Sequence, residues 1–439
     1  MAAVEKQTRT SLRDEVVELL VALLRLDTVS PPGNETLAAD VLRDYLARSG
    51  VEGSYLSKAP ERANLIARLP GGDGPTLSLI AHTDTVRAEP EDWTHSPWSG
   101  HVEDGEVWGR GALDMKGQVA ASAVAFASLA RERFVPSGDL LLVLHADEEV
   151  GDDFGMSWLA REHPDSVRAD FCLNEGGGER VVFGGRPIYL CTVGEKMTAP
   201  FIVRVRGRAG HASVPSISDN ALVKAAPILE ALARLQPPKT LLPPVARFLE
   251  TVLGEAPPPE VALDRARALH PLAAELVEPL LSLTLAPTII EASKQRNVIP
   301  GTCEITVDCR MLPGQGPADL EPLLRAGLPA GDWELEWLEA ERLGGSSSPT
   351  DTPLWAALQA WVDRVEPGAQ LAPLVSAGFT DSHWLREAFG TVAYGFMPLR
   401  AMDAEVAGRL VHSTDERAAI DDLADAVDVF RHVAQTLLS

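Results

Sequence analysis

Ionisable side chains follow three apolar runs of the sequence, each where a strand is expected to end. His82 and Asp84 follow the first run, Glu148 and Glu149 the second, and Glu175 the third. Open α/β sheets bind ligands beyond the carboxyl ends of their parallel strands. Carboxylates that converge on one edge repel each other unless a cation lies among them. The pattern therefore predicts a divalent metal site, and its His and carboxylate donors without thiolate suit Zn²⁺, Mn²⁺ or Co²⁺.

Two further segments carry candidate ligands. Asp114 lies in the glycine-containing segment Gly109–Gly117, where glycine lets the backbone approach a crowded site closely. It precedes an Ala-rich helical pattern, so it could instead be only a helix N-cap. His412 lies in Leu410–Glu416, just before the last expected helix. By default we interpret the remaining histidines outside these segments as non-ligands, and His145 is expected to lie within a strand. They are His95, His101, His145, His163, His270, His383 and His432.

The elements that must position these residues alternate between strands and helices in the first half of the chain. This alternation predicts an α/β fold with a mostly parallel sheet flanked by helices. A continuous apolar run such as Leu140–Leu144 is typical of a strand that is covered on both faces. The expected strands are 64–69, 76–82, 139–146 and 169–174, and the expected helices include 35–48, 115–133 and 153–162.

The pattern changes near Cys191 to alternating apolar and polar residues, as in a half-exposed strand. We interpret 196–344 as a smaller α+β domain inserted into a discontinuous first domain, 1–195 and 345–439. A Gly/Ser hinge is expected at 344–349. The Pro-rich stretch 236–260 is expected to be an irregular insertion.

Composition excludes several classes of function. The 439 residues carry a net charge of −24, which argues against binding to nucleic acid or to an anionic membrane. Four cysteines without a CxxC pair and an N-terminus without an apolar run predict a cytoplasmic protein. The sequence has no GxSxG, GxxxxGK, HExxH or complete GxGxxG motif, so a serine hydrolase or a nucleotide enzyme has no support.

Taken together, these segments resemble the di-zinc metallopeptidase M20 family over nearly the whole chain. The run Trp93–Gly117 looks most like the branch that holds carboxypeptidase S and the N-acyl-amino-acid hydrolases. The segments that carry the resemblance are His82-Thr83-Asp84, Gly109–Gly117, Asp147-Glu148-Glu149, Asn174-Glu175, Gly210-His211 and His412.

The resemblance implies two Zn²⁺ ions per subunit, with Co²⁺ or Mn²⁺ as substitutes. His82 and Glu175 would bind one ion, Glu149 and His412 the other, and Asp114 would bridge both. The peptide bond after Asp114 is usually cis in this family.

The resemblance also assigns catalytic roles. Asp84 would accept the second N–H of His82, Glu148 would be the general base, and His211 would donate a hydrogen bond to the oxyanion. Neighbouring residues in an extended segment point in opposite directions, which supports different roles for Glu148 and Glu149 but does not say which one binds metal. In dimeric members this histidine comes from the partner's inserted domain, so we expect a homodimer.

Substrate contacts are implied as well. Arg310 would bind an α-carboxylate, although it could instead form a structural ion pair with Asp308 or Glu304. Asn297 would lie near the same group, and Gly378 would belong to a loop beside the pocket. Related sequences often have a second glycine where this chain has Phe379, which would narrow the pocket.

The sequence thus predicts a di-zinc hydrolase that cleaves the amide bond of small N-acyl amino acids or dipeptides with a free carboxylate. The inserted domain would serve as a lid and dimerisation domain. The alternatives are a biosynthetic deacylase of the succinyl-diaminopimelate desuccinylase or acetylornithine deacetylase type, and a non-catalytic metal-dependent binding protein. A substrate panel would separate the three.

Overall fold

The computed structural model describes residues 2–151, 153–338 and 345–439, and the chain divides into two compact units. Unit 1 comprises the chain up to Val193, Ser348–Leu374 and Thr380–Ser439, and unit 2 comprises Gly194–Ser347 and Val375–Phe379. The predicted boundary at residue 344, and with it the start of the expected hinge, lies outside the described residues.

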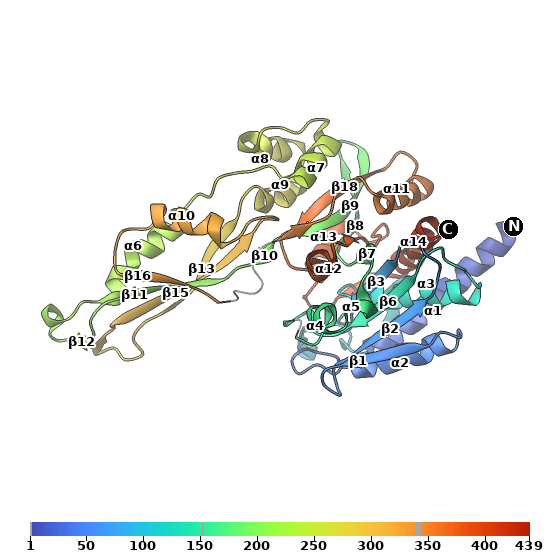
Figure 1. Cartoon of the computed structure of the whole chain (residues 1–439), viewed down its shortest axis with the longest axis horizontal. Coiled ribbons are helices and arrows are strands. Elements are labelled where there is room, and N and C mark those ends of the chain that lie inside the picture. Colours follow the sequence, from blue (N-terminus) through green and yellow to red (C-terminus); the bar gives the residue numbers. More distant parts are fainter. Residues whose placement is uncertain (1, 152, 339–344) are drawn as a thin grey trace. The chain divides into compact units, whose positions relative to one another are not determined.

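The centre of unit 1 is a twisted mixed sheet (Figure 1). Four central strands run parallel in the order β6-β3-β7-β19, whereas β1, β2 and β9 pair antiparallel with their neighbours. The strands are β1 (Gly53–Ser57), β2 (Ala63–Leu69), β6 (Leu140–His145), β3 (Leu77–His82), β7 (Phe171–Asn174), β19 (Val392–Gly395) and β9 (Arg186–Glu195), with β8 (Gly177–Phe183) and β18 (Gln370–Ser376) also paired to β9. The α/β class is confirmed, and the predicted parallel pairing holds for the four central strands only.

Helices cover both faces of this sheet, because alternate side chains of each strand point to opposite faces. Leu142 and Leu144 of β6 join one core cluster, whereas Val143 joins the other. The first cluster packs under α1 (Ala2–Leu24), α2 (Thr36–Ala47), α3 (Lys116–Arg131), α11 (Pro353–Val365) and α14 (Ile420–Leu437), and the second under α4 (Met156–Glu162), α5 (Pro164–Val167) and α12 (Ser382–Phe389). A sheet covered on both faces explains the continuous apolar runs of the central strands.

Smaller elements complete unit 1. A three-stranded sheet has the order β20-β5-β4, and the remaining helices are short. Their bounds are β4 (His101–Glu103), β5 (Glu106–Trp108), β20 (Arg417–Ala419), η1 (Pro90–Asp92) and α13 (Ala404–Leu410).

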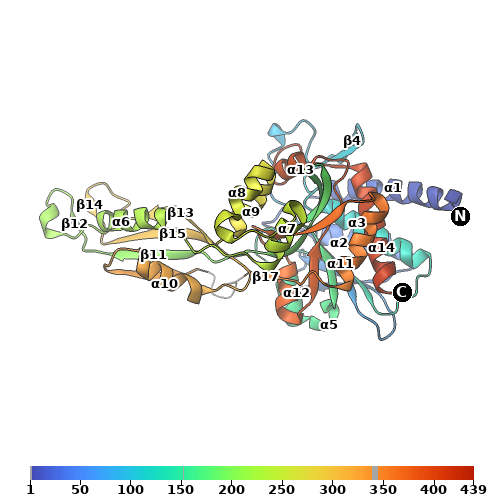
Figure 2. The ribbon, with the colours of Figure 1, turned by 90° about the horizontal axis from the view of Figure 1, so that it is seen from above.

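Unit 2 is built on an antiparallel sheet with the order β10-β15-β11-β16, and β13 pairs with β15. The strands are β10 (Met197–Thr198), β11 (Phe201–Arg206), β13 (Thr284–Glu291), β15 (Thr302–Met311) and β16 (Trp333–Trp337), with β12 (Gly210–His211) paired to β14 (Val298–Ile299) and β17 (Ser346–Ser347) paired to the end of β9. Apolar residues of α6 (Ala221–Arg234) and α10 (Pro317–Gly327) pack on the sheet. Figure 2 shows both helices beside its strands.

The prediction of an irregular Pro-rich insertion was wrong. Residues 236–260 contain α7 (Pro243–Leu253) and the start of α8 (Pro259–Leu269), and α9 (Pro271–Val277) follows. Unit 2 also has two short turns of 3₁₀ helix, η2 (Pro215–Ile217) before α6 and η3 (Glu278–Leu280) after α9. Pro243, Pro259 and Pro271 each stand at the beginning of a helix, where proline is favoured because its missing N–H needs no partner. The prolines therefore mark helix starts.

Within the described residues, none of the helices combines the length and the apolar character that are needed to cross a bilayer.

Gly395 should be essential to the parallel pairing of β7 and β19. A Cβ atom at this position would lie 1.9 Å from the carbonyl oxygen of Glu175 and 2.1 Å from that of Gly176, and backbone cannot move aside cheaply. We expect Gly395→Ala to lower the free energy of unfolding by about 1–3 kcal/mol in urea titrations. The matched control is Gly408→Ala in α13, where nothing lies within 4 Å of the added atom. Equal stability of the two variants would contradict the expectation.

Candidate metal centre

The central strands bring the predicted acidic residues and His82 to one edge of the sheet. Strand β3 runs parallel to both β6 and β7, so their carboxyl ends meet at this edge. His82 is the last residue of β3, Glu148 and Glu149 follow β6, and Glu175 follows β7 directly. The strand-end pattern in the sequence anticipated this placement.

Five side chains form two clusters that share one carboxylate. In the first, His82 Nε2 lies 3.1 Å from Asp114 Oδ1 and 3.7 Å from Glu175 Oε2. In the second, His412 Nε2 lies 2.9 Å from Asp114 Oδ2 and 3.1 Å from Glu149 Oε2. Each oxygen of Asp114 therefore faces a different histidine. The structure brings all five predicted ligands together.

The surroundings of His82 decide which of its nitrogens can bind a metal ion. Its Nδ1 lies 3.1 Å from the carbonyl oxygen of Asp84 and 3.5 Å from Asp84 Oδ1, and both are acceptors. Nδ1 must therefore carry the proton, which leaves the lone pair on Nε2 facing Asp114 and Glu175. The carboxylate of Asp84 also accepts the backbone N–H groups of Glu148 (3.3 Å) and Glu149 (3.1 Å).

The donor set fits divalent metal ions. Asp114, Glu149 and Glu175 are three carboxylates gathered around two imidazole nitrogens, and they would repel each other without a cation. In addition, Glu149 Oε1 is buried and has no hydrogen-bond partner among the described residues. Histidine nitrogen and carboxylate oxygen suit Zn²⁺ and its close relatives.

Glu148 lies beside these clusters. Burial raises the pKa of its carboxyl well above the usual value, and the negative charge of Glu175 raises it further. A carboxylate with a raised pKa binds a proton more readily, which suits a group that takes a proton and passes it on. By contrast, His145 lies within β6, as expected, and belongs to neither cluster.

The loop that carries Asp114 is held by a residue that the sequence analysis missed. The buried carboxylate of Glu416 accepts the backbone N–H groups of Gly111 (3.0 Å), Leu113 (2.8 Å) and Asp114 (3.0 Å). Arg110 Nη1 donates to it as well, at 2.5 Å. Because Glu416 lies only four residues after His412, one side chain connects the segments of two predicted ligands. The peptide bond after Asp114 is cis, as the resemblance implied.

A second buried network holds the segment of Glu148. Arg62 donates to Glu35 Oε2 (2.6 Å) and Oε1 (2.8 Å) and to Asp147 Oδ1 (2.6 Å). Asp147 and His412 both have left-handed backbone, with φ of 71° and 59°. This conformation is unfavourable for residues other than glycine, and such residues gather at functional sites where the surroundings enforce them. The sequence offered no signal for Arg62, because its partners lie far away along the chain.

The remaining predicted site residues belong to unit 2. His211 in β12 pairs with Val298 in β14, and the backbone carbonyl of Asn297 accepts the backbone N–H of Ala212 at 3.0 Å, so His211 and Asn297 are neighbours. Arg310 lies near the end of β15 and donates to both oxygens of Asp308, at 3.0 and 3.2 Å. Gly378 is exposed in the loop after β18.

Unit 2 does not bring these residues together. Figure 1 shows β12 at one end of unit 2 and β10, the strand that pairs with Arg310, at the other. Asn297 precedes β15 and Arg310 is near its far end. The eight steps from Thr302 to Arg310 span about 26 Å of extended strand. Within one copy, an extended strand therefore separates Asn297 from Arg310.

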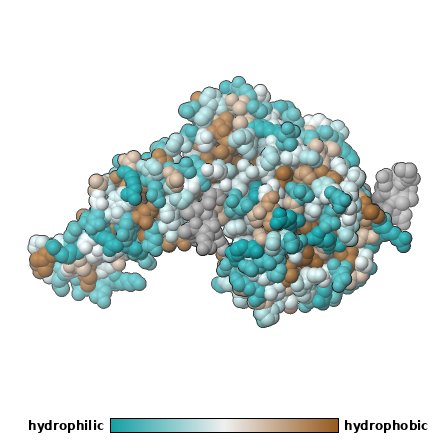
Figure 3. All heavy atoms as spheres, viewed as in Figure 1, coloured by the Kyte–Doolittle hydropathy of each residue, from teal (hydrophilic) through white to brown (hydrophobic). Residues whose placement is uncertain are grey.

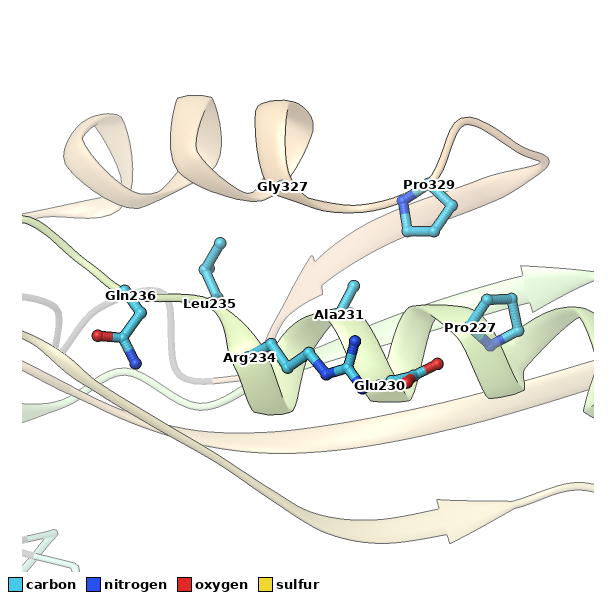
Figure 4. A pocket seen from close by; sticks show the side chains of 8 residues that line it. All are labelled: Pro227, Glu230, Ala231, Arg234, Leu235, Gln236, Gly327 and Pro329. Atoms are coloured by element: carbon cyan, nitrogen blue, oxygen red, sulfur yellow. Dashed lines mark ion pairs between the residues drawn. The ribbon is translucent and has the colours of Figure 1, made fainter.

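A hollow of about 550 Å³ lies between α6 and the end of α10 in unit 2 (Figure 4). Its charged lining residues, Glu230 and Arg234, form an ion pair at 2.6 Å. None of its lining residues belongs to the clusters described above.

The sequence profile of peptidase family M20/M25/M40 matches residues 78–436. The chain belongs to this family. As an M20 peptidase it is a metal-dependent hydrolase, which agrees with the donor set of the two clusters.

Several known proteins are similar to this M20 peptidase. A succinyl-diaminopimelate desuccinylase from Methylobacterium sp. (strain 4-46) is 28% identical over 424 residues, which cover 94% of each chain. The human N-fatty-acyl-amino acid synthase/hydrolase PM20D1 is 28% identical over 370 residues, covering 80% of this chain and 72% of that protein. The M20 family metallo-carboxypeptidase from Sulfolobus solfataricus has the same fold, with a TM-score of 0.71, 18% identity, and coverage of 96% of this chain and 99% of that one.

Loss of Arg62 should destabilise the fold strongly. Arg62→Met would leave the buried Glu35 and Asp147 carboxylates without their cation, and breaking such a pair costs about 3–5 kcal/mol. The matched control is Arg68→Met, which removes a more exposed pair with Asp139 and should cost at most about 1 kcal/mol. Urea unfolding of both variants measures the difference. Similar losses in the two variants would show that the Arg62 network does not hold the Glu148 segment.

Proposed function

We propose that the protein is a dinuclear metallohydrolase that cleaves the amide bond of small N-acyl amino acids or dipeptides with a free carboxylate. The observation that carries this proposal is the position of Asp114, which shares its two oxygens between the His82–Glu175 pair and the His412–Glu149 pair. A carboxylate placed in this way is suited to bridge two cations. We propose Zn²⁺ as the native ion, with Co²⁺ or Mn²⁺ as substitutes, because the donors are nitrogen and oxygen.

The chain's own residues supply the proton transfers. When bound, the two metal ions would lower the pKa of a water molecule and polarise the amide carbonyl. Glu148 would take a proton from the attacking water and deliver it to the nitrogen of the leaving amine. Asp84 would keep Nε2 of His82 unprotonated by binding the opposite side of the ring, and would hold Glu148 by its backbone N–H.

Residues of unit 2 would recognise the substrate. His211 would donate a hydrogen bond to the carbonyl oxygen as negative charge develops there. Arg310 would bind the substrate carboxylate through its planar guanidinium, in exchange for or together with its present partner Asp308. Gly378 and Asn297 would line the approach to the reacting bond.

A homodimer would bring the two ends of unit 2 to one substrate. His211 and Arg310 are separated along β15 within one copy, so His211 would act on the substrate that is bound by a second copy. Val214, Ile217 and Val298 near His211 have 44%, 61% and 39% of their surface exposed. Figure 3 shows apolar atoms at the end of unit 2 where Figure 1 places β12. A partner subunit would cover these side chains.

A biosynthetic deacylase is the second candidate function. It is favoured by the desuccinylase from Methylobacterium, which matches 94% of this chain. Both candidates hydrolyse an amide beside a carboxylate, so the same centre serves either one. We also propose a cytoplasmic location, because the four cysteines are unpaired and buried.

The proposal is tested by replacing the general base without touching the ligands. The purified zinc-loaded protein should hydrolyse N-acyl amino acids, dipeptides, acetylornithine or succinyl-diaminopimelate, and Glu148→Gln should reduce kcat at least about 100-fold. Zinc content, measured by mass spectrometry, should not change, because Glu148 is not among the clustered donors. Metal-dependent turnover that survives Glu148→Gln would sink the proposal. Each substrate is assayed beside its α-carboxamide. Turnover of the carboxamide should fall sharply if the guanidinium of Arg310 binds the substrate carboxylate.

Mixing two inactive variants tests the shared site. His211→Ala and Glu148→Gln should each be inactive alone, because each lacks one group at every site. After subunit exchange, a mixed dimer would combine the intact Glu148 of one chain with the intact His211 of the other. Random mixing should then restore about a quarter of wild-type activity, since half of the dimers are mixed and each has one complete site. If mixing restores no activity although light scattering shows dimers, His211 does not act across the interface.

A further inference from the structure

A third cluster of metal-binding side chains lies outside the proposed catalytic centre. His95, His101 and Glu103 each offer a ligand atom, and these atoms all lie within 4.8 Å of one another. His95 Nε2 is 3.3 Å from Glu103 Oε2, and His101 Nε2 is 3.7 Å from the same oxygen. The two imidazole rings are stacked with their centroids 3.8 Å apart. All three side chains are partly exposed, so an ion from solution can reach them.

The local fold explains why these residues meet. Asp104 and Gly105 form a tight turn, with φ of 51° and 82°, and both values match the left-handed turn that joins two hairpin strands. The turn fixes the register of β4 and β5. His101 and Glu103 are two residues apart in β4, so their side chains point to the same face.

Aromatic and polar contacts hold His95 at this face. Trp108 is the cross-strand partner of His101, and the ring of His95 packs edge-on against it with centroids 5.1 Å apart. The guanidinium of Arg417 lies over the ring of Trp108, 4.5 Å from the ring centroid. Thr94, next to His95, donates from its backbone N and its hydroxyl to Asp415, at 2.7 and 2.8 Å. The backbone before His95 is thereby held in place.

The spacing of the donors is that of ligands around one ion. At metal–ligand distances near 2.0–2.2 Å, two donors at a tetrahedral angle lie about 3.3 Å apart. The separation of His95 Nε2 from Glu103 Oε2, 3.3 Å, equals this value, and that of His101 Nε2, 3.7 Å, is slightly larger. They also match the separations in the two catalytic clusters, which run from 2.9 to 3.7 Å.

We propose that His95, His101 and Glu103 form a third divalent metal site, separate from the catalytic centre and specific for borderline transition metals such as Zn²⁺ or Ni²⁺. Two imidazoles and one carboxylate suit these ions, whereas Mg²⁺ and Ca²⁺ prefer oxygen ligands alone. Water completes the coordination on the exposed side. The net charge of −24 raises the local concentration of cations around the chain. The earlier interpretation of His95 and His101 as non-ligands is revised by this proposal.

A bound ion would also fasten a segment that supports the catalytic centre. Thr94 binds Asp415, which lies between His412 and Glu416 in the sequence. An ion at the third site would fix His95 to the β4–β5 hairpin and so restrict the Thr94–Asp415 contact. The ion is therefore expected to raise the melting temperature of the whole protein and not only of the hairpin.

Nickel stoichiometry tests the proposal without reference to activity. Wild-type protein, equilibrated with Ni²⁺ and separated from free metal by gel filtration, should retain one more equivalent per chain than His95→Asn/His101→Asn. Glu91→Gln is the control for added or lost surface charge, because Glu91 is an exposed acid on the same segment. It should retain as much nickel as wild type. Circular dichroism confirms that the variants are folded.

Tryptophan fluorescence gives a second readout at the site. Because Trp108 packs against His95, bound Ni²⁺ should quench part of the emission of wild-type protein, and the double histidine variant should lose that part of the quenching. Equal nickel content and equal quenching in wild type and the double variant would overturn the proposal. In that case the three residues are a hydrogen-bonded surface cluster only. The outcome does not depend on the proposed function, since the catalytic ligands are intact in every variant.

Discussion

The sharing of Asp114 between two histidines is the constraint on which the rest of the site depends. Its oxygens face His82 at 3.1 Å and His412 at 2.9 Å, and these two histidines lie 330 positions apart in the sequence, at 82 and 412. A carboxylate that must meet both has no freedom to rotate. The side chain can therefore be shared only if the backbone on both sides is fixed.

Buried carboxylates provide this fixation. Glu416 binds the backbone around Asp114, Asp84 binds the backbone of Glu148 and Glu149, and Asp147 is bound in turn by Arg62. Each of these acids accepts several hydrogen bonds from groups that would otherwise be unpaired in the interior, where an unmade bond is costly. The predicted ligands are thus positioned by acids whose oxygens accept hydrogen bonds from the nearby backbone and from Arg62. Asp147 and His412 in these segments have left-handed backbone, a conformation that the surrounding structure must enforce.

The sequence predicted the part of the site that follows from sheet geometry. His82 ends one of three neighbouring parallel strands, and Glu149 and Glu175 follow the other two, so their convergence could be expected from apolar runs alone. Asp114 and His412 lie on loops, and only the family resemblance assigned them. Glu416 and Arg62 could not be predicted, because their partners lie 302–306 and 27–85 residues away and no local pattern records such pairs. The Pro-rich helices were missed for a different reason, since proline at the first position of a helix and proline in a loop look alike without the following periodicity.

The antiparallel sheet of unit 2 limits how one chain could complete its own site. Arg310 and the His211–Asn297 pair are attached to opposite ends of β15, whose hydrogen bonds to β11 and β13 make it rigid. Bending this sheet to bring the two ends together would break many backbone hydrogen bonds, whereas a second copy can present its own His211 end with no change of fold. For this reason the proposed dimer is a simpler arrangement than an internal closure of unit 2. A second copy would also cover the apolar side chains of Val214 and Ile217, which are exposed in a single chain.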